Sequence, residues 1–411
     1  MVLSLPLPPN FFKCLPLTPA QIDQYLSQAV DNTHELIDKT IIHGGRVSYK
    51  MLSDEKHLKI YKGDYPGAPP NATIHLGYME VMASLDKVIA LFDTEATRPK
   101  EFCRRFGKGL LDAVHLYTLD VPTVDAPYKK TTLTWRAYDS QMPKMIMRRD
   151  ACQIECHNSF TVDGRRGWVR SHKSIRLECC PNLEAVCQLI RSKNHGSGHV
   201  FLESERPGYL DMYYVTHVDC SDGPSEWFVD KVMRCRRIVL DAIFKKRCRA
   251  LLDIDVFLRE DRLSRMPYVP PRPNSTALHR KCSLCCKSLP IIRKRQFCEK
   301  CGEAFCSRCV NVWDVRVHGR HERVLACYTC SIQTPETRLR TPSLLFARSK
   351  TAVSRSTIRS ENETRSTSSS TDSKVNSFLV SLGLSRATLA RQRLQEDEDD
   401  DDDNDSLVLI E

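Results

Sequence analysis

Apolar residues recur at intervals of three and four in three stretches of the chain, and this spacing predicts helices. The first stretch, residues 18–42, opens on Thr18-Pro19, a capping residue followed by a proline suited to the first helical turn. The second runs from Tyr78 to Leu91. The third, residues 224–262, is the longest, and its apolar stripe must pack against another part of the protein. That stripe consists of Phe228, Val232, Cys235, Val239 and Ile243.

Between the second and third predicted helices, the pattern changes to runs of aromatic and β-branched residues, which are typical of strands. Asp163-Gly164 separates two of these runs, and this dipeptide is typical of a tight β-hairpin. We therefore expect a central antiparallel sheet with the long helix packed on it, an α+β fold. The predicted strand runs are Leu133–Tyr138, Cys152–Val162, Gly167–Ile175 and His199–Thr216.

Polar residues within these runs leave two interpretations open. Arg170 and His172 share a parity with Trp168, so one face of the sheet mixes aromatic and basic groups. They either form a polar anchor in a cavity or belong to a solvated sheet face. A second alternation suits a solid core as well as a hollow one: Cys152, Ile154 and Cys156 on one side, Gln153, Glu155 and His157 on the other.

Composition divides the chain into four parts. Four prolines within residues 267–273 predict a stiff, extended linker over 266–280. It separates a domain of residues 1–265 from a small domain of residues 281–333. Residues 334–411 are rich in Ser, Thr and Arg and then acidic, with nine carboxylates among the ten residues Glu396–Asp405, so a disordered tail is expected.

Nine of the nineteen cysteines lie between residues 282 and 330. An odd number and this clustering favour reduced, metal-binding cysteines over disulfides. Eight of them form pairs with two intervening residues, which lets both thiolates of a pair reach one tetrahedral zinc ion. Four pairs therefore predict two zinc ions, with Cys286 as a spare thiol. The pairs are Cys282/Cys285, Cys298/Cys301, Cys306/Cys309 and Cys327/Cys330.

The order of these pairs resembles the FYVE family of zinc fingers. The gaps between pairs are twelve, four and seventeen residues, and a glycine, Gly302, follows the fourth cysteine. The resemblance implies a cross-braced finger, in which the first and third pairs hold one zinc and the second and fourth pairs hold the other. It also implies that bound metal supplies much of the folding free energy, because so short a finger has little apolar core.

The finger departs from the family at its lipid site. Gln296 and Phe297 stand where the family has two histidines, and Glu299 and Leu325 stand where it has arginines. These departures argue against selective recognition of phosphatidylinositol 3-phosphate. An apolar tip beside a basic cluster survives and predicts contact with an anionic membrane. A structural or protein-binding finger is the alternative. The tip residues are Ile291, Ile292, Arg293, Lys294 and Arg295.

Residues 75–262 resemble the START lipid-transfer domain in the order and spacing of several short motifs. The resemblance implies a helix-grip fold, in which a curved antiparallel sheet holds a long C-terminal helix around an apolar lipid tunnel. Combined with the finger, it is similar to START/FYVE proteins abundant in oomycetes. The motifs are Gly167–Ile175, Cys180-Pro181, Val200–Glu203, Pro207–Asp211, Gly223-Pro224 and Trp227.

The sequence contains no catalytic motif, neither a phosphate-binding glycine loop nor a Gly-x-Ser-x-Gly or His-Glu-x-x-His pattern. It therefore predicts a non-enzymatic zinc protein that binds lipid or tethers to membranes. The alternatives are an adaptor that binds a small GTPase, as Rab effectors do, and a RING-like ubiquitin ligase. The absence of a histidine ligand argues against the ligase, and Cys306 stands where a chromatin-binding PHD finger has histidine.

Charge and targeting features complete the prediction. The formal net charge of +10 falls to about +6 once two zinc ions hold eight thiolates, which does not call for a nucleic-acid partner. The N-terminus lacks a basic segment and is interrupted by prolines at positions 6, 8 and 9, unlike a secretory signal. We expect a cytoplasmic protein that is peripheral on endosomal membranes.

Overall fold

The computed structural model describes residues 3–55, 57–69, 71–107, 109–140, 147–219, 236–270, 281–289 and 296–332, without the side chains of 96, 97, 99 and 236–239. All of them belong to one compact unit, residues 1–342. Three predicted features lie outside the described residues: the tail from 334, the tip 291–295 and the segment with Trp227.

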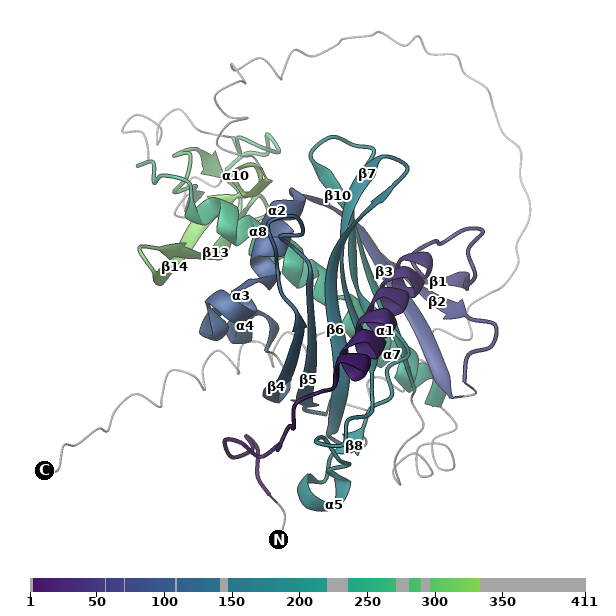
Figure 1. The fold of residues 1–411 in the computed structure, drawn as a ribbon. Coiled ribbons are helices and arrows are strands. Elements are labelled where there is room, and N and C mark those ends of the chain that lie inside the picture. Colours follow the sequence, from purple (N-terminus) through teal and green to yellow (C-terminus); the bar gives the residue numbers. More distant parts are fainter. Residues whose placement is uncertain are drawn as a thin grey trace, which may run out of the picture. The chain divides into compact units, whose positions relative to one another are not determined.

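A ten-stranded sheet occupies the centre of this unit (Figure 1). Nine strands follow the order β1-β2-β3-β10-β9-β7-β6-β5-β4 and pair in antiparallel fashion, whereas the short β8 pairs with β6 in parallel. The predicted antiparallel sheet is therefore confirmed. The strands are β1 Ser48–Glu55, β2 Leu58–Asp64, β3 Ala72–Met82, β4 Leu110–Asp120, β5 Lys130–Tyr138, β6 Arg149–Val162, β7 Arg165–Ser174, β8 Ile190–Arg191, β9 Ser197–Glu203 and β10 Tyr209–Asp219.

The hairpin signal is confirmed, but several strands were not foreseen. Asp163 and Gly164 both adopt positive φ, 50° and 76°, as a two-residue turn between twisted strands requires. The run predicted at His199–Thr216 is two strands, β9 and β10, which pair with each other. The strands β1 to β4 escaped prediction because their apolar positions do not alternate regularly, as the burial of β1 shows.

The helix α1, Pro19–Asp38, covers one face of the sheet, with Ala29 and Leu36 buried beneath it (Figure 1). Its start is confirmed, because Thr18 and Gln21 form a reciprocal capping box and Pro19 opens the first turn. It packs mainly against β7 and β6.

The helices α2, α3, α4, α7 and α8 lie on the opposite side of the sheet. Two predictions need correction here. Residues 78–82 end strand β3, so the second predicted helix begins only at Leu85. The long helix, where it is described, is two consecutive helices that meet at Arg249, and the second continues to Ser264. The bounds are α2 Leu85–Phe92, α3 Thr94–Thr97, α4 Pro99–Phe106, α7 Arg236–Cys248 and α8 Ala250–Ser264; the four-residue α5, Glu184–Cys187, lies in the loop after β7.

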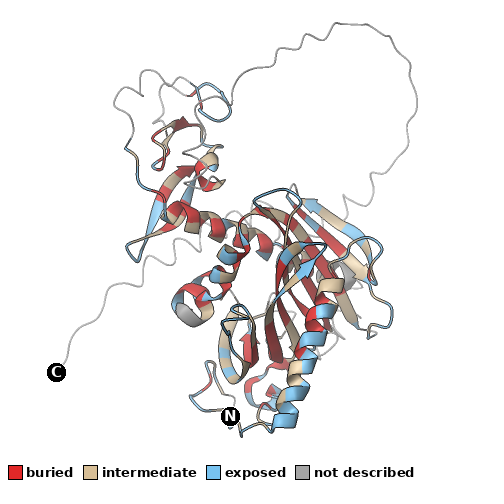
Figure 2. Ribbon diagram, turned by 45° about the horizontal axis from the view of Figure 1, so that its top comes forward, coloured by how far each residue is buried: buried red, intermediate tan, exposed pale blue. Residues whose placement is uncertain are grey.

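An apolar core fills the space between α2, the α7–α8 pair and the sheet, where Trp168, Phe201 and Met212 are buried against Leu251 and Ile254 (Figure 2). Gly77 of β3 permits this approach, since a Cβ there would lie 3.1 Å from Cys248 Cβ and from Leu251 Cδ1. The predicted packing of a C-terminal helix on the sheet is therefore confirmed. Among the described residues, no helix is both long and apolar enough to cross a bilayer.

The finger contains two short hairpins and a terminal helix around its own buried cluster. Trp313 anchors this cluster and donates its indole N–H to the carbonyl of Ala326 at 3.1 Å. Leu263 and Met266, from the end of α8 and the chain after it, belong to the same cluster. The elements are β11 Gln296–Phe297, β12 Ala304–Phe305, β13 Val310–Val317, β14 Arg320–Cys327 and α10 Tyr328–Ile332.

The first residues of the predicted linker lie against the finger. The N–H of Val269 donates to the carbonyl of Glu299 at 2.8 Å. The buried ammonium of Lys300 donates to the carbonyl of Met266 at 2.9 Å and lies 3.6 Å from the ring centre of Tyr268. Residues 266–270 are therefore fixed by finger contacts, and residues 271–280 lie outside the described part.

Candidate metal centres and ion cluster

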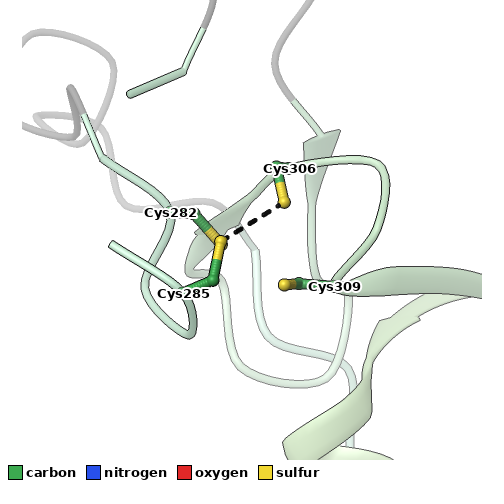
Figure 3. Close-up of side chains that lie close together, drawn as sticks. All are labelled: Cys282, Cys285, Cys306 and Cys309. Atoms are coloured by element: carbon green, nitrogen blue, oxygen red, sulfur yellow. Dashed lines mark hydrogen bonds between the residues drawn. The ribbon is translucent and has the colours of Figure 1, made fainter. Parts of the chain in front are cut away.

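Eight cysteines of the finger gather into two groups of four. Within each group the sulfur atoms all lie within 4.8 Å of one another. Figure 3 shows the group made of Cys282, Cys285, Cys306 and Cys309. The pairing is the interleaved one that the FYVE resemblance implied. Cys286 belongs to neither group and is exposed, as expected of a spare thiol. The first tetrad is Cys282, Cys285, Cys306 and Cys309, and the second is Cys298, Cys301, Cys327 and Cys330.

Tight turns in the backbone bring the two thiols of a pair together. Cys286 and Gly302, each directly after the second cysteine of its pair, adopt left-handed conformations with φ of 58° and 72°. The N–H of Cys286 then donates to the carbonyl of Cys282 at 2.9 Å, and that of Gly302 donates to Cys298 at 2.7 Å. Glycine suits this conformation, since a side chain there is strained.

In each tetrad the surroundings favour a thiolate at one sulfur and oppose it at another: burial raises the pKa of Cys309, and hydrogen bonds with the neighbouring thiols raise the pKa of Cys330. Burial opposes ionisation of Cys282, but backbone N–H groups of Cys285 and Cys306 lower its pKa to about 6. In the second tetrad, hydrogen bonds from neighbouring thiols hold the pKa of Cys298 far below its usual value. The N–H of Cys327 also donates to Cys298 Sγ at 3.2 Å. Four convergent sulfur donors per group fit zinc, which prefers soft ligands in a tetrahedron.

Ion pairs join the β13–β14 hairpin of the finger to α4 of the sheet unit, the part of the protein formed by residues 1–265. Arg104 of α4 pairs with Asp314 of β13 at 2.8 Å, and His321 of β14 lies 3.1 Å from Glu101. Arg262 of α8 is buried and donates to the carbonyl of Ser331 in α10 and, at 2.6 Å, to that of Met82 in β3. This residue thus ties the finger to the sheet through its backbone carbonyls.

The position where the FYVE resemblance would place a phosphoinositide site is occupied by the finger's own residues. Glu299 and Leu325, which replace two arginines of the FYVE pattern, bond to each other. The N–H of Leu325 donates to the Glu299 carboxylate at 2.8 Å, and the N–H of Glu299 donates to the Leu325 carbonyl at 2.9 Å. A carboxylate therefore stands where an anionic head group would need a cation. The tip residues Ile291 to Arg295 lie outside the described residues.

Four charged side chains meet on the face of the sheet that α2, α3 and α4 cover. Arg170 of β7 pairs with Glu155 of β6 at 2.6 Å and with Glu95 of α3 at 3.1 Å. Arg136 of β5 pairs with the same carboxylates, at 3.0 Å to Glu155 and 2.6 Å to Glu95. We call this group, Glu95, Arg136, Glu155 and Arg170, the ion cluster.

Three members of the ion cluster are buried, and the fourth, Glu95, has a side chain that is 34% exposed. Arg170 is only 5% exposed, and its guanidinium lies 5.2 Å from the ring centre of Phe92 and 5.8 Å from that of Phe102. The solvated-face interpretation of Arg170 is therefore wrong. That interpretation failed because α2 to α4 cover this face, and the alternation of residues along a strand does not predict which helices cover it.

Electrostatics keep the cluster charged. Burial opposes the ionisation of Glu155, yet Arg170 and Arg136 hold its pKa well below the usual range. Burial also opposes the charged form of the neighbouring histidines, and these stay neutral because they lack enough compensating charge. It lowers the pKa of His157 and lowers that of His199 to about 3. The cluster is thus a fixed ionic group beside neutral imidazoles.

Several side chains on this side keep accessible surface despite their surroundings. His157 and His172 are 14% and 16% exposed, and Tyr138 is 36% exposed. His199 and Tyr214 are half-buried, with ring centres 4.7 Å apart. Two pockets of about 460 and 210 Å³ lie elsewhere, the first at Ser264–Tyr268 and Arg316–His318, the second between Tyr65 and His217.

Comparison with known proteins gives similarity in structure only. No family model matches the sequence, and no curated protein is significantly similar to it. Similar solved structures include human StAR-related lipid transfer protein 5, at 13% identity and a TM-score of 0.37, covering 52% of this chain and 90% of that one. Human STARD10 matches at 12% identity and a TM-score of 0.34, covering 58% and 81%.

A third similar structure is the human StarD13 (DLC2) lipid transfer and protein localization domain, at 14% identity and a TM-score of 0.34, covering 59% of this chain and 96% of that one. These TM-scores are all below 0.5, so the helix-on-sheet fold is inferred from the strand order and packing of this chain itself. The finger's likeness to FYVE rests on the spacing and pairing of its cysteines.

Sequence reasoning found all eight tetrad cysteines but missed most of the ion cluster. Arg170 was singled out by its parity with Trp168. The sequence pattern identifies Glu155 only as one member of an alternation, and it singles out neither Glu95 nor Arg136. A signal was present, because a charged residue at position 136 interrupts an apolar strand. Its partner in α3 is 41 residues away and had no such signal.

Proposed function

We propose that this is a non-enzymatic, zinc-stabilised lipid-binding protein, in which a START-like unit takes an apolar ligand and the finger is structural. The observation that carries the proposal is the ion cluster, whose Arg136, Glu155 and Arg170 are buried. Burying charges costs several kcal/mol per ion before pairing offsets it, so a buried cluster is weak evidence for stability alone. Its use as a polar anchor for a lipid head group explains its position.

The surroundings of the cluster divide into a polar and an apolar part. His157, His172 and His199 are neutral imidazoles with accessible surface, so they can donate to or accept from a hydroxyl or ester. The buried rings of Trp168 and Phe201 lie against His157 and His199. A lipid with a small polar head and a bulky apolar body would match this division.

The finger's role in the proposal is to fold around zinc. The two tetrads would each hold one zinc ion, which supplies folding free energy that the small apolar cluster lacks. The carboxylate of Glu299 disfavours phosphoinositide selectivity, so membrane contact through Ile291–Arg295 would be weak and general. In this proposal the protein is cytoplasmic and reaches endosomal membranes peripherally.

Native mass spectrometry of the intact protein tests the main proposal. We expect two zinc ions and a retained lipid, and we expect the Glu155→Gln variant to keep both zinc ions while losing the lipid. Glu203→Gln, which breaks an exposed pair with Arg166, is the matched control and should keep both. A wild-type protein that never carries lipid, after incubation with a mixed lipid extract, would refute lipid binding.

The adaptor alternative is favoured by the closed phosphoinositide position, which leaves the finger's surface to a protein partner. Replacing Ile291 and Ile292 with alanine separates the two roles. Membrane insertion predicts loss of sedimentation with anionic liposomes, whereas protein binding predicts no change in it. A small GTPase that binds the wild-type protein and the alanine variant equally well would support the adaptor.

A further inference from the structure

Two cysteines outside the finger face each other at close range. The Sγ atoms of Cys14 and Cys179 are 3.0 Å apart although the residues are 165 positions apart in sequence. A disulfide bond measures about 2.05 Å, so the two sulfurs need to move together by only about 1 Å. Both side chains are partly accessible, whereas the neighbouring Cys180 and Cys152 are buried.

The segments that carry these cysteines are held in place on both sides. The N-terminal segment, purple in Figure 1, lies beside the loop with α5, where the N–H of Leu3 donates to the carbonyl of Val186 at 2.9 Å. The N–H of Leu7 donates to the Asp112 carboxylate at 2.7 Å. The ring of Phe12 lies 5.2 Å from that of Trp135. These contacts fix the chain leading into Cys14.

Contacts directly beside the pair fix the thiols themselves. The hydroxyl of Tyr117 donates to the carbonyl of Leu15 at 2.7 Å and lies 3.8 Å from Cys179 Sγ. The Cys14 thiol donates to Cys179 Sγ. Burial and this hydrogen bond raise the pKa of Cys14 to about 11, so Cys14 stays protonated and its S–H lies against the Cys179 sulfur.

We propose that Cys14 and Cys179 form a thiol-oxidation site that a peroxide converts to a disulfide, which locks the N-terminal segment onto the sheet unit. The Cys179 thiolate attacks one oxygen of hydrogen peroxide, the O–O bond breaks, and hydroxide leaves and takes a proton to become water. The Cys14 sulfur then attacks the sulfenic acid, an S–S bond forms, the S–O bond breaks, and a second water leaves. Two thiols and one peroxide thus give one disulfide and two waters.

The test uses full-length, zinc-loaded protein treated with one equivalent of hydrogen peroxide and then N-ethylmaleimide. Peptide mapping with fragment-ion sequencing should find Cys14 linked to Cys179, two hydrogens lighter than the free peptides, before a chromogenic chelator detects zinc release. The link should raise the thermal midpoint, and dithiothreitol should reverse both changes. Cys180→Ser is the matched control and should still form the link.

Two results would overturn the proposal. One is recovery of Cys14 and Cys179 as N-ethylmaleimide adducts after the finger has already released zinc. The other is a disulfide from Cys179 to a different cysteine in the wild type. A Cys14→Ser variant guards against a folding artefact, because it should keep the wild-type midpoint under reducing conditions and lose only the peroxide-dependent rise.

Discussion

The finger and the helix-covered ion cluster both bury ionisable groups, but they compensate for burial differently. In the finger, eight thiols of one kind converge on two points, and four of them belong to the buried cluster itself. In the sheet unit, two arginines and two carboxylates neutralise one another beside a larger apolar core, and one of the carboxylates, Glu95, is 34% exposed. The finger would therefore need metal ions to compensate its thiolates, whereas the ion cluster is complete without one. Loss of a single side chain should damage the two regions by different amounts.

The largest effect is expected in the finger. Cys298→Ser removes one ligand of the second tetrad, and structural zinc is worth about 10–16 kcal/mol in small fingers. We expect native mass spectrometry to count one zinc ion instead of two, and near-ultraviolet dichroism of Trp313 to weaken. Cys286→Ser, which changes an exposed thiol outside both tetrads, should keep two zinc ions. A Cys298→Ser protein with two tightly bound zinc ions would contradict the assignment.

The contrast in compensation also explains what could be predicted from sequence. The tetrads are visible because each ligand pair is local, and the FYVE resemblance implies the cross-brace between pairs. The ion cluster is built from α3, β5, β6 and β7, so its members meet only after the sheet has formed. Arg170 could be noticed from strand parity, but the cover that buries it could not. The strands β1 to β4 were missed for a related reason, since their burial does not alternate regularly.

The second prediction concerns the ion cluster. Glu155→Gln leaves Arg136 and Arg170 without the buried one of their two shared carboxylates, and breaking a buried pair costs about 3–5 kcal/mol. We expect a fall in the urea midpoint of the sheet transition, with the zinc count unchanged. Glu203→Gln, in an exposed pair, should barely move that midpoint. Equal shifts in the two variants would show that the cluster is no more buried in solution than a surface pair.

The third prediction is a pH dependence of the sheet unit. Burial lowers the pKa of His199 to about 3, whereas an unfolded histidine titrates near 6.5. Below about pH 6.5 the unfolded chain binds a proton that the folded chain does not, so stability falls as pH falls, until about pH 3. The slope per histidine is about 1.4 kcal/mol per pH unit.

His199→Phe should flatten this slope by roughly that amount, because Phe suits the stack with Tyr214 and Phe201 and does not titrate. Urea unfolding between pH 6 and 4 provides the measurement. His43→Gln is the control at an exposed histidine and should leave the slope unchanged. An unaltered slope in His199→Phe would mean that His199 is protonated in the folded protein.

The smallest effect distinguishes backbone strain from contact with the linker. Gly302 and Gly319 both adopt positive φ, 72° and 84°, so alanine strains the backbone at either position, by about 1 kcal/mol. Only at Gly302 would the added Cβ meet another segment, at 2.9 Å from the carbonyl oxygen of Pro270; around Gly319 there is open space. If residues 266–270 are part of the finger's packing, Gly302→Ala should lower the finger's thermal midpoint more than Gly319→Ala does. Equal losses would mean that this segment leaves the finger in solution, and the first residues of the predicted linker would then be free to move.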